Sequence, residues 1–234
     1  MRTSNGAVAH SVARREDAKT TRTISAARRA ALVRLLQERI GQWQFECDPG
    51  WGFISAQSAW KAASGRGTAG GDALRRLAVR EFELRLGPLP PLPLFEHAVG
   101  SMALLDPQSL QARLCALALL GRPGVLRSCV QREAREALQA TLGPAYPLLR
   151  ERSRQAPAVP AYAAAWTPLA WVWIGWRDLL AARAWPHRTL RRLARALLPS
   201  GRAGAPRLAV APRPIVALPD RLKELDLLFP STST

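Results

Sequence analysis

The sequence predicts a mainly α-helical (all-α) protein, a compact multi-helix domain with flexible basic termini. Apolar residues recur at helical spacing in several segments, capping residues stand at the ends of these segments, and no strand-like alternation persists. A length of 234 residues with 48% hydrophobic residues is enough for one domain with a core. We therefore predict a disordered basic tail over 1–25, a helical domain over 26–199 and a Pro-rich C-terminal tail over 200–234.

A pair of helices joined by a short turn is the predicted centre of the core. Asp106 is expected to cap the first helix, with Pro107 in its first turn, where the missing N–H costs nothing. Gly121 ends this helix and Pro123 opens the next, so the two helices are expected to pack antiparallel. The predicted apolar stripes are Leu110, Leu114, Leu117 and Leu120 on the first helix, and Leu126, Cys129, Val130, Ala134, Ala137, Leu138 and Leu142 on the second.

Two further helices are predicted before this pair. One runs from about Ser25 to Ile40, and the other begins at Asp72 and ends near Leu86. An aromatic, turn-rich segment over 43–60 follows the first of them. Its aromatic side chains are expected either to pack the segment onto the core or to contact a partner. The candidate partner-binding residues among them are Trp43, Trp51, Phe53 and Trp60.

Residues 155–176 carry no formal charge and are long enough to span a membrane. Three prolines interrupt this segment, and its four tryptophans gather towards one end instead of forming a belt at both ends. We therefore expect a loop followed by a short buried helix from Pro168 to about Ala184. A single membrane span remains the alternative.

The helix that follows Pro186 is predicted to be strongly amphipathic. Its apolar stripe is Leu190, Leu193, Leu197 and Leu198, and its opposite face carries Arg188, Arg191, Arg192 and Arg195. Four arginines on one helix face can bind an acidic protein, an anionic membrane or a phosphate backbone. They can equally form a solvated face whose side-chain stems cover apolar surface. Beyond this helix, residues 221–229 are expected to form one or two last amphipathic turns.

The formal net charge of +17 is unevenly distributed along the chain. Residues 150–223 carry 14 basic and 3 acidic side chains, whereas residues 41–149 carry 11 and 9. Basic flanks favour an acidic partner, an anionic membrane surface or nucleic acid. All but three of the 34 basic residues are arginine, which is typical of a GC-rich bacterial genome, so part of this charge reflects codon use.

The motifs of common catalytic and metal sites are not recognisable in the sequence. It contains no P-loop, GxSxG or HExxH motif, and its histidines lack ligand partners at metal-site spacing. We therefore predict a protein without enzymatic activity, catalytic residues, metal, cofactor or small-molecule substrate. The three cysteines, Cys47, Cys115 and Cys129, are expected to be buried free thiols in a reducing cytoplasm.

Several motifs occur in a characteristic order across residues 43–199. They are FECDPGW at 45–51, Leu104-Leu105-Asp106-Pro107 leading to Leu120-Gly121, Val130-Gln131-Arg132 leading to Leu142-Gly143 and Tyr146, Gly175-Trp176-Arg177, and Arg191-Arg192-Leu193 leading to Leu198-Pro199. In this order and spacing the chain resembles the SctK family (the YscK, OrgA and MxiK proteins) of bacterial type III secretion systems. The tails at 1–30 and 200–234 lie outside the resemblance.

The resemblance implies a non-enzymatic adaptor of the cytosolic sorting platform under the injectisome. Such a protein links a SctQ-like platform protein to the cytoplasmic domain of a SctD-like inner-membrane ring protein. It would lie at the cytoplasmic face of the bacterial inner membrane, with only indirect membrane association.

Two alternatives stay open. One is a basic nucleic-acid-binding protein, supported by a pI of about 11.6 but lacking a recognisable helix-turn-helix or stacking motif. The other is a peripheral or single-span membrane protein that uses residues 155–176.

Overall fold

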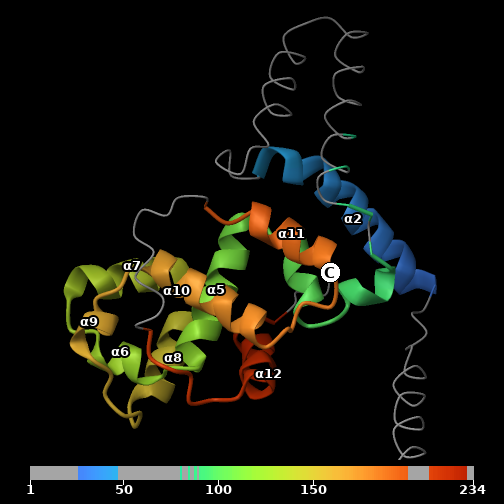
Figure 1. The fold of residues 1–234 in the computed structure, drawn as a ribbon. Helices are drawn as coiled ribbons and strands as arrows, with labels where there is room; N and C mark the ends of the chain where they lie inside the picture. Colours follow the sequence, from blue (N-terminus) through green and yellow to red (C-terminus); the bar gives the residue numbers. More distant parts are fainter. Residues whose placement is uncertain are drawn as a thin grey trace, which may run out of the picture.

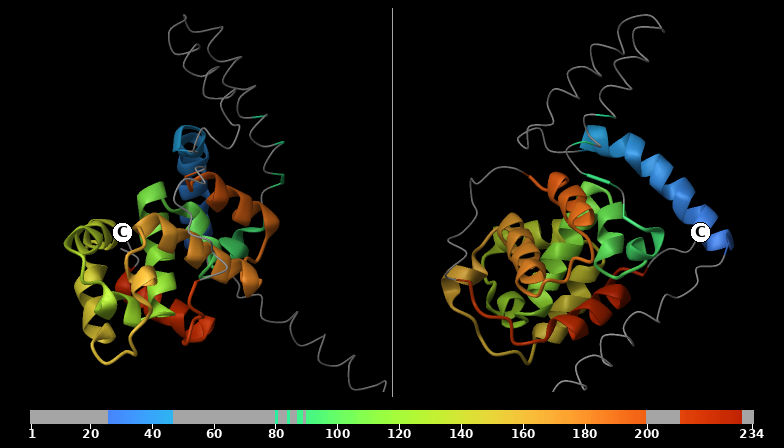
Figure 2. Two further views of the ribbon diagram at one scale, coloured as in Figure 1. Left: turned by 60° about the vertical axis from the view of Figure 1, so that its left-hand side comes forward. Right: turned by 45° about the vertical axis from the view of Figure 1, so that its right-hand side comes forward.

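The computed structural model describes residues 26–46, 87–88, 90–199 and 211–230, together with residues 80 and 84. The elements of these ranges are α-helices and short 3₁₀ helices (η), without a strand, as the sequence predicts. In chain order they are α2 (Ala26–Glu46), η2 (Leu92–Phe95), η3 (Gly100–Leu104), α5 (Pro107–Leu120), α6 (Gly124–Ser128), α7 (Arg132–Leu142), α8 (Ala145–Ser153), α9 (Ala161–Ala164), α10 (Pro168–Ala181), α11 (Arg188–Ala196) and α12 (Leu218–Leu228). Helices α6 to α9 lie at one end of the molecule, and α11 and α2 lie at the other (Figures 1 and 2).

Helix α5 runs through the middle of the core. The Asp106 carboxylate accepts the Ser109 N–H at 2.9 Å, Pro107 stands in the first turn, and Gly121 caps the C-terminus, all as predicted. Residues 114–120 are buried without interruption, so the C-terminal half of the helix is enclosed on all sides instead of presenting one apolar stripe. This enclosure requires partners from several distant parts of the chain.

The principal partner of α5 is α10, which crosses it closely. Thr167 caps α10. The helix begins at Pro168, as predicted, and ends at Ala181, short of the predicted end near Ala184. At the crossing, a Cβ atom on Gly175 would stand 2.0 Å from the carbonyl oxygen of Leu114, so only glycine allows the two backbones to approach this far. No helix of the described ranges is both long and apolar enough to cross a membrane.

The prediction of a single second helix in the central pair is wrong. The chain forms two helices there, α6 and α7, with a break between them. Cys129 leaves the helical conformation with ψ at 88°, and Val130 points into solvent with 81% exposure. The hydroxyl of Ser128 accepts the N–H of Val159 at 3.2 Å. Side chains at the end of α6 thus contact the loop before α9, where the sequence alone predicts an uninterrupted helix.

The C-terminal segment corrects the predicted domain boundary at residue 199. Residues 211–230, assigned to a Pro-rich tail, pack against the core, and α12 contacts α5 with Leu225 and Leu228 buried. The Ile215 N–H donates to the carbonyl of Gly121 at 2.8 Å, which fixes the approach to α12. The helical domain therefore includes this segment, while the predicted tail over 1–25 lies outside the described residues.

A buried group of three charges, here called the Asp178 cluster, joins α12 to the core. Arg122 donates to both carboxylate oxygens of Asp178 at 2.8 and 3.0 Å, and Arg221 donates to one of them at 2.6 Å. Burial raises the pKa of Asp178, but the hydrogen bonds and charges of Arg122 and then Arg221 outweigh burial and hold this pKa below its usual range. The carboxylate therefore stays ionised inside the core. Backbone carbonyls of Leu117, Ala118 and Pro212 accept further guanidinium N–H groups.

Helix α2 packs along η2 and η3 at one end of the domain. Leu36 is buried, the Arg39 guanidinium donates to the carbonyl of Leu105 at 2.6 Å, and Arg28 pairs with Glu96. The helix continues to Glu46, past the predicted end at Ile40. The predicted helix over 72–86 lies outside the described residues except at positions 80 and 84.

Candidate docking surfaces

The predicted arginine face stands on α11, which the core holds firmly. The His187 ring accepts the Thr189 N–H at 3.2 Å and caps the helix, and the Thr189 hydroxyl donates to the carbonyl of Pro88 at 3.0 Å. The predicted apolar stripe is buried, namely Leu190, Leu193, Leu197 and Leu198. The helix is thus anchored along one side, and its other side is left for solvent.

Three of the four predicted arginines, Arg188, Arg191 and Arg192, are exposed on this outer side. The prediction that Arg195 belongs to the exposed face is wrong. Arg195 is half-buried, and its guanidinium carbon lies 3.9 Å from the ring centroid of Trp173. Burial lowers the pKa of Arg195 to about 10, so it remains a cation at neutral pH. Arg195 therefore stabilises the contact between α11 and α10 and does not extend the exposed face.

We expect Arg195→Lys to lower the free energy of unfolding by about 1 kcal/mol, since a compact ammonium cannot stack on the Trp173 ring as a planar guanidinium does. Urea denaturation followed by tryptophan fluorescence measures this change. Arg191→Lys is the matched control on the exposed face, where a change below about 0.5 kcal/mol is expected. Equal effects of the two substitutions would contradict a stacking role.

The predicted aromatic surface is described only in part. Trp43 lies on α2, in a helical backbone and not in the turn-rich segment that the sequence suggested, and its side chain lies outside the described part. Trp51, Phe53 and Trp60 also lie outside the described residues. Helices α2 and α11 both contact η3 and lie at the same end of the molecule (Figures 1 and 2).

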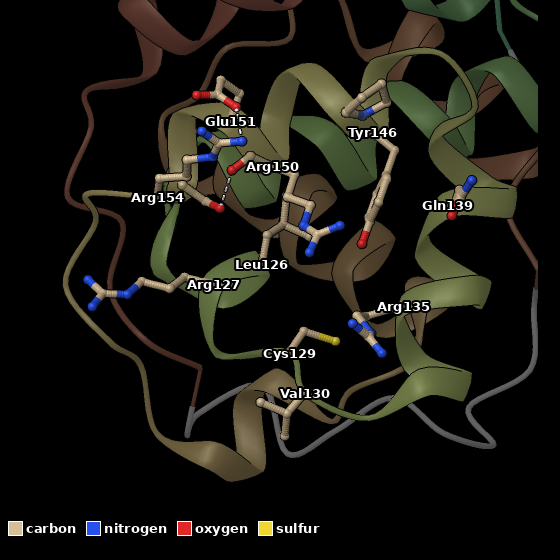
Figure 3. A pocket seen from close by; sticks show the side chains of 12 residues that line it. Leu126, Arg127, Cys129, Val130, Arg135, Gln139, Tyr146, Arg150, Glu151 and Arg154 are labelled. Carbon is tan, nitrogen blue, oxygen red and sulfur yellow. Dashed lines mark hydrogen bonds and ion pairs between the residues drawn. The ribbon is translucent and has the colours of Figure 1, made fainter.

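A cavity of about 840 Å³ lies among α6, α7 and α8, at the opposite end of the molecule (Figure 3). Four arginines line this arginine pocket, together with apolar and polar residues of the same helices. Its lining residues are Leu126, Arg127, Cys129, Val130, Arg135, Gln139, Tyr146, Pro147, Arg150, Glu151, Ser153 and Arg154. The sequence did not predict this pocket, because it indicated one continuous helix where the chain forms α6 and α7.

The arginine pocket is suited to binding and not to nucleophilic chemistry. Its floor carries the buried, free thiol of Cys129, which points towards Arg135 in Figure 3. Burial raises the pKa of this thiol, and the nearby Arg135 charge only partly opposes the shift, so the group is a neutral thiol at pH 7. Cys115 is likewise a buried free thiol, whereas Cys47 lies outside the described residues.

In the described part of the chain, no three His, Cys, Asp or Glu side chains gather as they would around a metal ion. Comparison with models of known protein families, with curated proteins and with solved structures finds no match to this chain.

Proposed function

We propose that this protein is a non-enzymatic adaptor of a bacterial type III secretion system, linking a SctQ-like platform protein to the cytoplasmic domain of a SctD-like ring protein. The observation that carries the proposal is the arginine face of α11, with Arg188, Arg191 and Arg192 exposed on a helix whose other side is fixed in the core. The motif order of the sequence supplies the choice of partners. In this proposal the adaptor works at the cytoplasmic face of the inner membrane.

A helix that is fixed in the core and carries three exposed arginines is well suited to docking on an acidic protein patch. Arginine binds carboxylates through two parallel hydrogen bonds, and such charge pairs fix orientation and raise the association rate. The backbone of α11 is already ordered by the His187 cap, by the hydrogen bond of Thr189 to Pro88 and by its buried leucines. Docking would therefore require ordering of the arginine side chains only, which limits its entropic cost.

The test is an affinity purification of the tagged protein from its own cells, with and without nuclease, read by mass spectrometry. We expect nuclease-resistant recovery of SctQ-like and SctD-like proteins, reduced at least about tenfold by the combined variant R188E/R191E/R192E. The matched control, R29E/R80E/R213E, makes the same change in net charge at exposed arginines outside α11 and outside the arginine pocket. This control is expected to retain recovery.

Two results would contradict the proposal. Equal losses in the two triple variants would mean that net charge, and not the α11 face, governs recovery. Recovery that collapses with nuclease would favour the second candidate, a nucleic-acid-binding protein, for which the net charge of +17 is the specific observation. In that case binding should weaken steeply as the salt concentration rises.

A further inference from the structure

We propose that the arginine pocket binds an acidic, partly apolar peptide segment of a partner protein. This site is separate from the α11 face, because the pocket lies among α6, α7 and α8 at the other end of the molecule (Figures 1 and 3). The inference does not depend on the proposed place in a secretion system. It follows from the charge, the apolar lining and the size of the pocket.

The charged side chains that line the pocket are mostly arginines, so the pocket carries net positive charge. A smaller hollow of about 240 Å³ adjoins it and shares Arg135, Gln139, Tyr146 and Arg150 with its lining. Two carboxylates line the pocket and hollow, and each is already paired: Glu151 with Arg154 at 2.8 Å and Glu136 with Arg132 at 2.7 Å.

Three lining arginines therefore carry positive charge that no lining carboxylate offsets, namely Arg127, Arg135 and Arg150. Arg127 is held in place by its hydrogen bond to the carbonyl of Ala156 at 2.7 Å. A ligand with several carboxylates would complement this arrangement, since each arginine can bind a carboxylate bidentately.

The apolar part of the lining selects among acidic ligands. Val130 is 81% exposed at the pocket, and Pro147 on α8, which is also exposed, belongs to the same lining. A β-branched side chain so open to water gains by contact with an apolar group. A ligand that carries both carboxylates and apolar side chains would therefore satisfy both parts of the lining.

Size and shape favour a peptide over nucleic acid or a membrane. The volume of about 840 Å³ falls in the range of about 300–1,000 Å³ of small-ligand sites, which admits a short segment of chain but not a folded domain. Tyr146 is the aromatic residue of the lining, and its ring is buried, so it offers no stacking platform for bases. A concave pocket also meets a flat lipid surface poorly.

The test measures fluorescence anisotropy of a fluorescein-labelled peptide of about ten residues that alternates Glu or Asp with Leu. We expect saturable binding to the full chain, weakened at least about tenfold by R135E/R150E. The matched control R29E/R213E makes the same charge change at exposed arginines away from the pocket and should bind nearly as the unmodified protein does. A peptide with Ser in place of Leu, and the variant Val130→Ser, should each bind several-fold more weakly.

Circular dichroism of every variant checks that the fold is kept, and Val130→Ser changes an exposed side chain that the fold does not need. The proposal is overturned if the unmodified protein shows no saturable binding, or if the two double variants lose binding equally. Tighter, pocket-dependent binding of a single-stranded oligonucleotide or of anionic phospholipid vesicles would also overturn it. The R188E/R191E/R192E variant should keep the peptide affinity, which separates this test from that of the adaptor proposal.

Discussion

Replacing Asp178 with Ala is expected to lower the free energy of unfolding by about 3–5 kcal/mol. The substitution leaves the guanidinium groups of Arg122 and Arg221 buried without the carboxylate that both contact at 2.6–3.0 Å. A buried charge that loses its partner keeps its desolvation cost and loses the attraction that offsets this cost. Urea denaturation followed by circular dichroism gives the change in free energy.

The control for this prediction is an exposed ion pair on α12, the helix that carries Arg221. Glu224 accepts a hydrogen bond from Arg152 at 2.6 Å, and both side chains are about 40% exposed. Glu224→Ala is expected to cost at most about 1 kcal/mol, because water solvates the charge that remains. A loss for Asp178→Ala as small as that for Glu224→Ala would contradict the buried role of the Asp178 cluster.

Acid titration gives a second measurement of the same interaction. The pKa of Asp178 in the folded protein lies below its usual value of 3.8, so its stabilising contribution is complete above pH 3.8 and is lost as the pH falls through the folded pKa. The stability difference between the unmodified protein and Asp178→Asn should therefore be constant near neutral pH and should shrink below about pH 3.8. A stability difference that grows as the pH falls would contradict a lowered pKa of Asp178 in the folded protein.

Gly175→Ala is expected to destabilise the protein by about 1–3 kcal/mol or more, through overpacking of α10 against α5. The added methyl would stand 2.0 Å from the carbonyl oxygen of Leu114, an atom of the opposing backbone that cannot rotate away. The direction of the stability change is informative, because a Gly→Ala substitution at an exposed helix position stabilises a protein by about 1 kcal/mol. Thermal and urea unfolding of the two proteins measure the effect.

Ala181→Ser serves as the control on the same helix. Ala181 is exposed in the last turn of α10, so one added atom there should change the stability by less than about 0.5 kcal/mol. A stable Gly175→Ala variant would mean that the two helices can separate without loss. The close approach would then not be required for the core.

Local signals in the sequence predicted the elements whose ends depend on local chemistry. The Asp106 cap, the start of α10 at Pro168 and the buried leucines of α11 follow from capping and periodicity. The break after α6 and the docking of α12 depend on contacts between residues far apart in the chain, such as Ser128 with Val159 and Arg221 with Asp178. Periodicity carries no information about such contacts.

The difference between local signals and long-range contacts also explains which parts of the candidate surfaces could be predicted from the sequence. The exposed arginines of α11 were predictable, because helical spacing places them opposite the leucine stripe. The position of Arg195 was not, because the ring that holds it belongs to Trp173 on another helix. The arginine pocket was missed for a similar reason, since its walls come from α6, α7 and α8 and meet only after folding.

The Asp178 cluster also sets an order of events during synthesis of the chain. Helices α5 and α10 leave the ribosome before α12, so Arg122 and Asp178 can pair while Arg221 is still to be made. Until α12 arrives, the side of α5 that it will cover faces water, together with the carbonyl of Leu117. Closure of the core therefore waits for a segment that is translated after α10, and a nascent chain halted before residue 211 exposes apolar surface that the folded protein buries.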